Sequence, residues 1–337
     1  TFRGRETRTV DEAAEAGALR HLAHEQHGCR FLQDQLDLRH KPHIDLIFEA
    51  TKADAVTLAM DPFGNYLVQK LVQYGTTEQR GELVELTAAQ MAEVALNVHG
   101  TRVIQKMVEC ADSYEQKSTI ATAIMPRLME LIRDMNANHV VQRCLAALPS
   151  DLAAGIYDQV TLDCLSIASH RHGCCVLQRC LDHADAPNRD RIIAEVVRNA
   201  AELVVDPFGN YVVQYILDLK QPALTTAIVN ALRGGFAELS LQKFSSNVIE
   251  KCLKSSDQVT VRLVAEELTS AETFPSLLHD PFANYVIQTL LTVGHDDLVG
   301  MIVAKIQPHL QTLRSTLYGK RIQAKLLKRC PNSKAGR

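Results

Sequence analysis

The sequence predicts an all-α solenoid, a fold built from repeated helical units, and three observations support this class. A motif recurs along the chain, seen most clearly as Asp61-Pro62-Phe63-Gly64-Asn65-Tyr66-Leu67-Val68-Gln69. Counted at its last position, successive copies lie 36, 36, 37, 36, 36, 36, 38 and 35 residues apart. No segment shows the alternation of apolar and polar residues that is typical of a strand. A steady period of this size is typical of units that stack and contact only their neighbours.

Each copy of the motif has the features of an amphipathic helix. Asp61 is a favourable N-cap and Pro62 suits a first helical turn, so the motif predicts a helix that starts there. At about 100° per residue, one face of this helix is apolar and the opposite face is polar. The apolar face consists of Leu67, Val68, Leu71 and Val72. A small residue such as Gly64 precedes the polar pair in every copy, so we expect close contact there between helices of neighbouring repeats.

The recurring motif divides the chain into four parts. Residues 1–18 are charged and only weakly apolar, and we expect an N-terminal extension or partial cap. Residues 19–313 hold eight repeats. We expect residues 314–330 to form a degenerate C-terminal capping repeat with Gln323 at the last motif position, and residues 331–337 to form a disordered tail.

A second amphipathic stretch follows each motif, as in residues 83–94 and 120–132, and we expect it to form a packing helix. The connection before repeat eight is slightly longer, around residues 255–257 or 273–275. A plain insertion and a partner-docking loop both explain the extra length. The chain starts with Thr1, so we expect it to be a fragment of a longer protein.

The overall charge argues against one class of partner. The net charge is −3 and the pI is about 6.5, whereas proteins that bind duplex nucleic acid through bulk electrostatics are usually basic. A cation nevertheless follows the last motif position in several repeats. These cations are Lys70, Lys106, Arg143, Arg179 and Lys251. Both a solvated helix face and a functional basic stripe remain open interpretations.

The cysteines and histidines do not form a metal or catalytic pattern. The nine cysteines include no CxxC pair, and Cys144, Cys180 and Cys252 fall on the apolar face, so we expect reduced core thiols. The histidines form no helical metal-binding pair, so no metal or cofactor is expected. No nucleophile–base pair or phosphate loop is present, which argues against an enzyme. No apolar run is long enough to span a membrane, and no secretory signal is visible.

The polar face of every motif carries two hydrogen-bonding side chains one helical turn apart, with a third residue directly after the first. We call these three residues a rung, with a first, a middle and a second position. The first positions are Cys29, Asn65, Thr101, Asn138, Cys174, Asn210, Ser246 and Asn284. The second positions are Gln33, Gln69, Gln105, Gln142, Gln178, Gln214, Glu250 and Gln288. The middle positions are Arg30, Tyr66, Arg102, His139, Cys175, Tyr211, Asn247 and Tyr285.

This ladder of rungs favours single-stranded nucleic acid as the ligand. Aromatic rings and guanidinium planes stack on unpaired bases, and amide pairs suit a base edge that a duplex would hide. The alternative is a protein-binding α-solenoid, because such arrays also carry asparagine ladders. The regular alternation of Asn/Gln rungs with Cys/Gln or Thr/Gln rungs favours a nucleic acid, since a generic peptide groove has no reason to alternate two chemistries.

These motifs resemble the repeats of the Pumilio/FBF (PUF) family of RNA-binding proteins over nearly the whole chain. The resemblance implies a right-handed, crescent-shaped solenoid of three-helix repeats that binds RNA antiparallel to the chain, one base per repeat. It implies that Asn with Gln reads uracil, Cys or Thr with Gln reads adenine, and Ser with Glu reads guanine. From repeat eight back to repeat one, the implied site is UGUAUAUA. The middle residues Arg30, Tyr66, Arg102, His139, Tyr211, Asn247 and Tyr285 would stack on bases.

Repeat five departs from the family pattern, because Cys175 replaces a large stacking residue. In this it is similar to fungal PUF proteins that accept an extra base after UGUA. The resemblance further implies a cytoplasmic monomer that binds mRNA 3′ untranslated regions, recruits deadenylase or other repressor proteins, and represses mRNA stability and translation. Two alternatives are a nucleolar PUF-like ribosome-assembly factor and a protein-binding scaffold. The acidic charge balance and the regular rungs count against the nucleolar alternative.

Overall fold

The computed structural model describes residues 9–329, and within that range it contains helices and turns but no strand. These residues separate into two compact units. The first comprises residues up to 162 together with 179–188, and the second comprises residues 163–178 together with those from 189 onward. The predicted all-α repeat architecture is confirmed.

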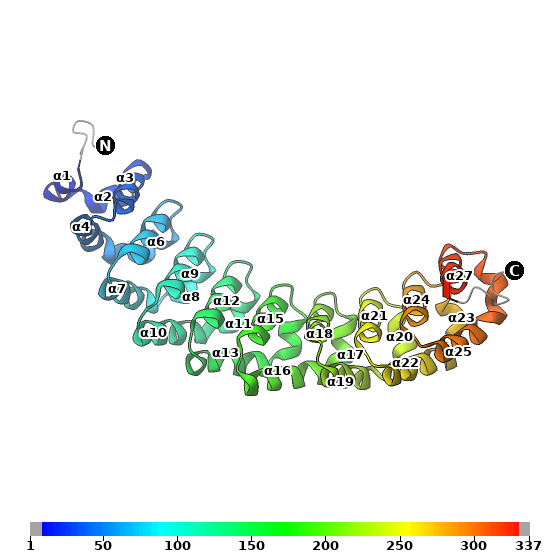
Figure 1. Ribbon diagram of the computed structural model, residues 1–337. Coiled ribbons are helices and arrows are strands. Elements are labelled where there is room, and N and C mark those ends of the chain that lie inside the picture. The colour runs from blue at the N-terminus through cyan, green and yellow to red at the C-terminus, as the bar shows by residue number, and fades with distance from the viewer. Residues whose placement is uncertain (1–8, 330–337) are drawn as a thin grey trace. The chain divides into compact units, whose positions relative to one another are not determined.

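Short helices follow one another through the first unit (Figure 1). They are α1 (Val10–Glu15), α2 (Leu19–Ala23), α3 (Gln26–Asp37), α4 (Lys41–Thr51), η1 (Lys52–Asp54), α5 (Ala55–Met60), α6 (Gly64–Tyr74), α7 (Thr77–Ala88), α8 (Met91–Leu96), α9 (Gly100–Cys110), α10 (Tyr114–Ile124), η2 (Met125–Arg127), α11 (Leu128–Arg133), α12 (Asn138–Ala147) and α13 (Ser150–Leu162).

The second unit has the same kind of helix order. Its helices are α14 (Cys164–Ala168), α17 (Ala200–Val205), α18 (Gly209–Asp218), α19 (Pro222–Leu232), α20 (Phe236–Ser240), α21 (Ser245–Ser255), α22 (Gln258–Ser270), α23 (Phe274–Leu277), α24 (Ala283–Val293), α25 (Asp296–Ile306), η3 (Gln307–His309), α26 (Leu310–Leu313) and α27 (Leu317–Arg329). Helices α15 (Gly173–His183) and α16 (Ala186–Arg198) contain residues of both units.

Each repeat has a short first helix, a motif helix and a longer second helix, as in α5, α6 and α7. Within the first unit, the motif helices α3, α6, α9 and α12 pack one against the next, and α7, α10 and α13 form a second row (Figure 1). Within the second unit, α18, α21, α24 and α27 form the corresponding series of motif helices. Stacking in this way places equivalent residues of successive repeats side by side inside each unit.

The apolar face of the motif helix forms the core, as predicted. Leu67, Val68 and Leu71 are at most 1% exposed, and residues at the same positions in the other repeats are similarly buried. Burying a leucine or valine side chain contributes about 1.5–3 kcal/mol relative to leaving it exposed. The continuous row of such residues therefore stabilises each unit.

The expected close approach at the small residue occurs within a repeat and not between repeats. A Cβ atom on Gly64 would lie 2.8 Å from the carbonyl oxygen of Leu58, which belongs to the first helix of the same repeat. Gly209 meets Leu203 in the same way. The small residue therefore allows the short first helix to cross directly against the start of the motif helix.

The motif helix begins two residues later than the sequence predicts, at Gly64 instead of Pro62. Helix α6 begins at Gly64, and Asp61 lies in the preceding turn. The Oδ1 atom of Asp61 accepts hydrogen bonds from the backbone N–H groups of Phe63, at 2.8 Å, and of Gly64, at 2.7 Å. Asp61 thus satisfies unpaired N–H groups at the helix start, as an N-cap does, although a tight turn precedes the helix proper.

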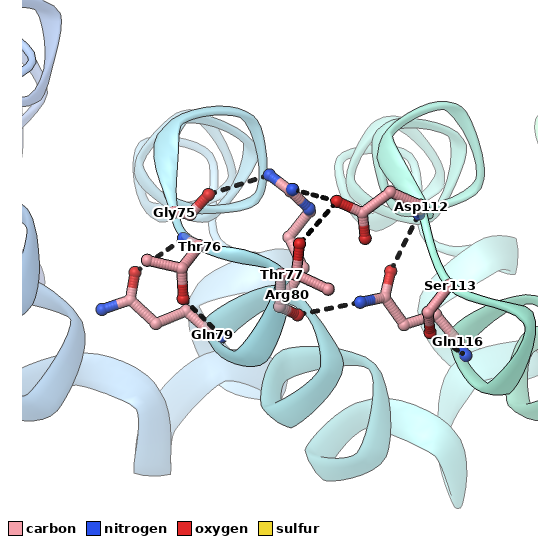
Figure 2. A network of polar contacts seen from close by, with 8 residues as sticks. All are labelled: Gly75, Thr76, Thr77, Gln79, Arg80, Asp112, Ser113 and Gln116. Carbon is pink, nitrogen blue, oxygen red and sulfur yellow. Dashed lines mark hydrogen bonds and ion pairs between the residues drawn. The ribbon is translucent and has the colours of Figure 1, made fainter.

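Polar side chains join successive repeats on the second row, as Figure 2 shows for repeats two and three. The Arg80 guanidinium forms an ion pair with Asp112 and donates to the Gly75 carbonyl at 2.8 Å. The Gln116 Nε2 atom donates to the Thr77 carbonyl at 2.8 Å. These contacts link the connection between α6 and α7 to the start of α10.

Gln323 does not occupy the last motif position of the capping repeat, so that prediction is wrong by one residue. A Cβ atom on Gly319 would lie 2.3 Å from the carbonyl oxygen of Leu313, which makes Gly319 the equivalent of Gly64. Counting from Gly319, the last motif position is Ala324. The prediction followed the glutamine identity, whereas the usual spacing of 36 residues from Gln288 also leads to Ala324.

In the longer connection before repeat eight, both segments singled out in the sequence lie at the start of a helix, α22 or α23. Asp257 caps the N-terminus of α22 by accepting from the Thr260 N–H at 2.8 Å. Phe274 begins α23 and is only 4% exposed. Residues 9–18 of the predicted N-terminal extension include α1, and the predicted tail 331–337 lies outside the described residues.

Candidate nucleic-acid interface

The three positions of a rung differ in exposure in the same way in all eight repeats. Every first position is buried, every second position is half-buried, and every middle position is exposed. Asn65, for example, is 1% exposed, whereas its neighbour Tyr66 is 53% exposed. The sequence-predicted residues thus lie together on the motif helices, with rungs one to four in the first unit and rungs five to eight in the second.

The four asparagine rungs share one hydrogen-bonding geometry. In the rung of repeat two, Asn65 Nδ2 donates to the carbonyls of Asp61, at 2.8 Å, and Pro62, at 3.0 Å. The Gln69 Nε2 atom donates to Asn65 Oδ1 at 3.0 Å. The same three hydrogen bonds recur around Asn138, Asn210 and Asn284.

This geometry orients the amides before any ligand binds. Both donor hydrogens of the asparagine are used by the turn of its own repeat, so its Oδ1 atom faces the glutamine. The glutamine retains Oε1 as an acceptor and one Nε2 hydrogen as a donor. An Asn/Gln rung therefore presents one donor and one acceptor, both on the glutamine, whose amide is held by its hydrogen bond to the asparagine.

Two of the other first positions, Thr101 and Cys29, are tied to the following repeat, whereas Cys174 and Ser246 donate to carbonyls of their own turns. Thr101 Oγ1 donates to the carbonyl of Asn136 at 3.1 Å and accepts from Gln105 Nε2 at 3.2 Å. In repeat one, Cys29 Sγ donates to the carbonyl of Phe63 at 3.4 Å. The Gln33 Nε2 atom reaches the same carbonyl at 3.2 Å. Thr and Cys also have shorter side chains than asparagine.

Repeat five differs from the others in its turn and its middle position. His170 replaces the capping Asp, and its Nδ1 atom accepts from the backbone N–H groups of His172 and Gly173 at 3.3 and 3.4 Å. Cys174 is buried and Cys175 is exposed. Burial raises the pKa of Cys174 to about 12, so this thiol stays protonated at neutral pH. The exposed Cys175 has no ring or guanidinium with which to stack on a base.

The cations that follow the second position form ion pairs and do not make a free basic stripe. Lys70 pairs with Asp37, and Lys251 pairs with Asp218, in each case across two repeats. Arg143 pairs with Glu109 at 3.2 Å. Lys106 and Arg179 pair with acids on their own helices, Glu109 and Asp182. Three of these five ion pairs therefore join neighbouring repeats at the edge of the rungs.

Two functional features were missed in the sequence. The first is the capping residue of the turn, which holds the carbonyls that orient each asparagine, and its signal is the Asp or Asn four residues before the first position. The second is Arg321 of α27, whose Nη1 atom donates to the Tyr285 hydroxyl at 2.6 Å. Its guanidinium carbon lies 5.7 Å from the centre of the Tyr285 ring. Numbering the capping repeat from Gly319 places Arg321 at a middle position.

The described residues carry no group of three or more His, Cys, Asp or Glu side chains placed to hold a metal ion. Within residues 9–329, no helix combines the length and apolarity needed to cross a membrane. Burial also raises the pKa values of Cys144 and Cys252 to about 12, so these core thiols are not poised as nucleophiles.

These features define a helical-repeat protein. Its repeats stack, its first rung positions are buried and hydrogen-bonded, and its middle positions are exposed. Comparison with known proteins identifies the repeat. The Pumilio-family RNA binding repeat matches residues 20–50, 54–86, 90–125, 127–161, 163–197, 199–233, 235–269 and 275–307. The chain belongs to the Pumilio (PUF) family.

Curated relatives support the same family. The chain is 40% identical over 310 residues to the Pumilio domain-containing protein C6G9.14 of Schizosaccharomyces pombe, covering 92% of this chain and 46% of the relative. It is 42% identical over 304 residues to the putative pumilio homolog 7, chloroplastic, of Arabidopsis thaliana, covering 89% of this chain and 46% of the relative. The chain therefore spans about half the length of these relatives.

Solved structures are similar over nearly the whole chain. The Puf4 RNA binding domain bound to the HO endonuclease RNA 3′ UTR recognition sequence has a TM-score of 0.83 and 41% identity, covering 90% of this chain and 97% of that one. The RNA-binding domain of yeast Puf5p bound to AAT2 RNA has a TM-score of 0.82 and 30% identity, covering 94% and 98%.

Proposed function

We propose that this chain binds single-stranded RNA in a sequence-specific manner and reads UGUA-containing elements in mRNA 3′ untranslated regions. One observation carries the proposal. In all eight repeats a buried first position and a half-buried second position flank an exposed middle position. Family membership and the RNA-bound structures of Puf4 and Puf5p support RNA as the ligand.

The hydrogen-bonding groups support the base assigned to each rung. An Asn/Gln rung has a donor and an acceptor on its glutamine, which match the N3–H and O4 groups of uracil. A Cys/Gln or Thr/Gln rung has a smaller first residue, which leaves room for the larger ring system of adenine. The acceptor-only carboxylate of Glu250 matches the two N–H donors on the Watson–Crick edge of guanine. In antiparallel order these rungs read UGUAUAUA.

The exposed middle positions support stacking between neighbouring bases. Tyr66, Tyr211 and Tyr285 are 53%, 57% and 42% exposed. Arg30, Arg102, His139 and Asn247 are also exposed. Base stacking on an aromatic side chain contributes about 1–3 kcal/mol per base. At Cys175 this contribution is missing, and we infer that the protein accepts an extra base after UGUA.

The cellular part of the proposal is a cytoplasmic, monomeric repressor that lowers mRNA stability and translation by recruiting a deadenylase complex or other repressor proteins. The 3′ UTR sequences in the Puf4 structures support this choice of RNA region. Pull-down of deadenylase subunits by the full-length protein, together with the half-life of a reporter mRNA bearing the element, tests this part.

Fluorescence anisotropy with short RNAs tests the binding proposal. The probes are UGUAUAUA, the same RNA with one base inserted after UGUA, and a variant in which ACA replaces UGU. We expect tight binding to at least one of the first two and a loss of at least a hundredfold with ACA, because all three rungs that face UGU lose their matched bases. Equal affinity for all three probes would contradict sequence-specific recognition and favour a scaffold role.

A further inference from the structure

The second position of repeat seven has surroundings unlike those of the other rungs. Four rungs have an acid four residues after the second position, namely Asp37, Glu109, Asp182 and Asp218. Repeat seven has Lys254 there. Directly after the second position, repeats two to five and repeat seven have a lysine or arginine, whereas repeat one has Asp34, repeat six has Tyr215 and repeat eight has Thr289. Lys254 and Thr289 both occur beside the single glutamate among the second positions.

Both Lys254 and Thr289 contact Glu250. The Nζ atom of Lys254 lies 3.1 Å from Glu250 Oε2 on the same helix, α21. The Oγ1 atom of Thr289, on α24, donates to the same oxygen at 3.1 Å. Thr289 is only 6% exposed, whereas 58% of the Lys254 side chain is exposed. Thr289 thus holds Oε2 from the buried side, and Lys254 approaches from solvent.

The charges around Glu250 differ from those around Gln214: Lys254 stands where repeat six has Asp218, and Thr289 stands where the next repeat has Lys251. Three of the cations, Lys70, Arg143 and Lys251, each reach back to the acid that lies four residues after the second position of the preceding repeat. A glutamate at the second position would lie one helical turn from that acid, and like charges at this spacing are destabilising. In repeat seven, Lys254 places a cation at that spacing instead. At position 289 a lysine would lie near Lys254 and repel it. The chain has the short Thr289 there instead, and it contacts Glu250.

We propose that Thr289 and Lys254 complete the guanine-reading site of repeat seven, with Thr289 as a positioning residue for the Glu250 carboxylate and Lys254 as its charge partner. This inference rests on the proposed function. The Thr289 hydroxyl fixes Oε2, so Oε1, which accepts no hydrogen bond from any described residue, faces the ligand as an acceptor. Guanine then donates to the carboxylate from its Watson–Crick edge. The specificity of rung seven accordingly extends into repeat eight.

Replacement of the Thr289 hydroxyl tests the positioning role. Thr289→Val keeps the shape and removes the donor, and Thr289→Ser keeps the donor. The readout is the affinity ratio for RNAs carrying G, A, U or C at the second base. We expect Thr289→Val to lower the preference for G by about fivefold to tenfold, the size of the net contribution of one typical hydrogen bond, and Thr289→Ser to retain it. Thr292→Val is the matched control, because the Thr292 hydroxyl bonds only to the Gln288 carbonyl of its own helix.

The outcomes separate this inference from the proposed function. If the unmodified protein shows no preference for G at the second base, the assignment of guanine to repeat seven fails and the inference fails with it. If the unmodified protein prefers G and Thr289→Val prefers it equally, only the positioning role is overturned.

A transfer of the site into repeat six provides a gain of function that misfolding cannot imitate. Asn210→Ser with Gln214→Glu transfers the rung alone, and adding Asp218→Lys with Lys251→Thr transfers its surroundings. We expect the quadruple variant to prefer G at the third base at least five times more strongly than the double variant Asn210→Ser with Gln214→Glu. Asp218→Lys with Lys251→Thr alone should still prefer U. An equal preference for G in the double variant Asn210→Ser with Gln214→Glu and in the quadruple variant would refute the role assigned to Lys254 and Thr289.

Discussion

Asn65, Asn138, Asn210 and Asn284 are buried although asparagine is mostly an exposed residue type, and their hydrogen bonds explain why. Each amide donates to two carbonyls of its own turn and accepts from the glutamine one helical turn later. A buried polar group is tolerated when it is fully hydrogen-bonded. The buried asparagine at the first position is therefore held in place and gives the half-buried glutamine a fixed hydrogen-bond partner.

Changing Ser246→Asn together with Glu250→Gln should convert repeat seven from guanine to uracil preference. The double variant supplies the pair found at Asn210 and Gln214, and a glutamine has a donor where the carboxylate has none. Competition binding with RNAs that carry G or U at the second base measures the switch. A double variant that still prefers G would show that these side chains do not choose the base.

Changing Tyr285→Ala should weaken binding of a matched RNA by about tenfold without changing which base is preferred. The ring supplies stacking area, worth about 1–3 kcal/mol, and no base-specific hydrogen bond. Tyr285→Phe is the control, because it keeps the ring and removes the hydroxyl that contacts Arg321. A changed base preference in Tyr285→Ala would contradict the stacking role.

At the scale of the element, the turn before each motif helix links stability to recognition. In repeat six, Asp206 Oδ1 accepts from the N–H groups of Phe208 and Gly209 at 2.8 and 2.7 Å. Its own carbonyl accepts from Asn210 Nδ2 at 2.8 Å. The residue that caps the helix start thus also orients the first position of the rung.

Changing Asp206→Ala should lower the free energy of unfolding by about 1 kcal/mol, the usual effect of losing an N-cap. The loss should be local, because repeats of a solenoid depend chiefly on their neighbours. Asp206→Asn is the matched control, since Asn97 makes the same two contacts in repeat three. Urea unfolding followed by circular dichroism measures both variants, and equal loss in the two would exclude a capping role.

The ion pair near the N-terminus gives a pH dependence with a defined sign. Hydrogen bonding from Arg20 lowers the pKa of Asp54 from 3.8 to about 2. A carboxyl whose pKa is lower in the folded state stabilises the fold above its unfolded pKa and loses that effect as the pH falls. We expect the stability advantage of the unmodified protein over Asp54→Asn to be constant above about pH 5 and to shrink between pH 4 and pH 2. An advantage that grows on acidification would contradict this assignment.

At the scale of the whole molecule, RNA binding should depend only modestly on salt. The net charge is −3, and the cations beside the rungs are paired with acids. Each phosphate neutralised on single-stranded nucleic acid contributes about −0.7 to the slope of log affinity against log salt. We expect a slope no steeper than about −3, measured by anisotropy between 50 and 300 mM salt. A much steeper slope would indicate extensive phosphate neutralisation.

The sequence by itself determined the repeat architecture and the identity of the rung residues. A period of about 36 residues defines the unit. Within a helix, side chains one turn apart share a face whatever the surroundings, so pairs such as Asn65 and Gln69 follow from spacing alone. Burial of Leu67 and Val68 follows from the same periodicity.

Only the tertiary structure decided the contacts between residues about 36 positions apart. The pairing of Lys70 with Asp37 and of Thr289 with Glu250 depends on how one motif helix packs against the next. Helical periodicity carries no information on that packing. The close approach of Gly319 to Leu313 fixed the register of the last repeat, in which Ala324 and not Gln323 takes the last motif position. Local spacing therefore defines each rung, and contacts between repeats define the surroundings in which it acts.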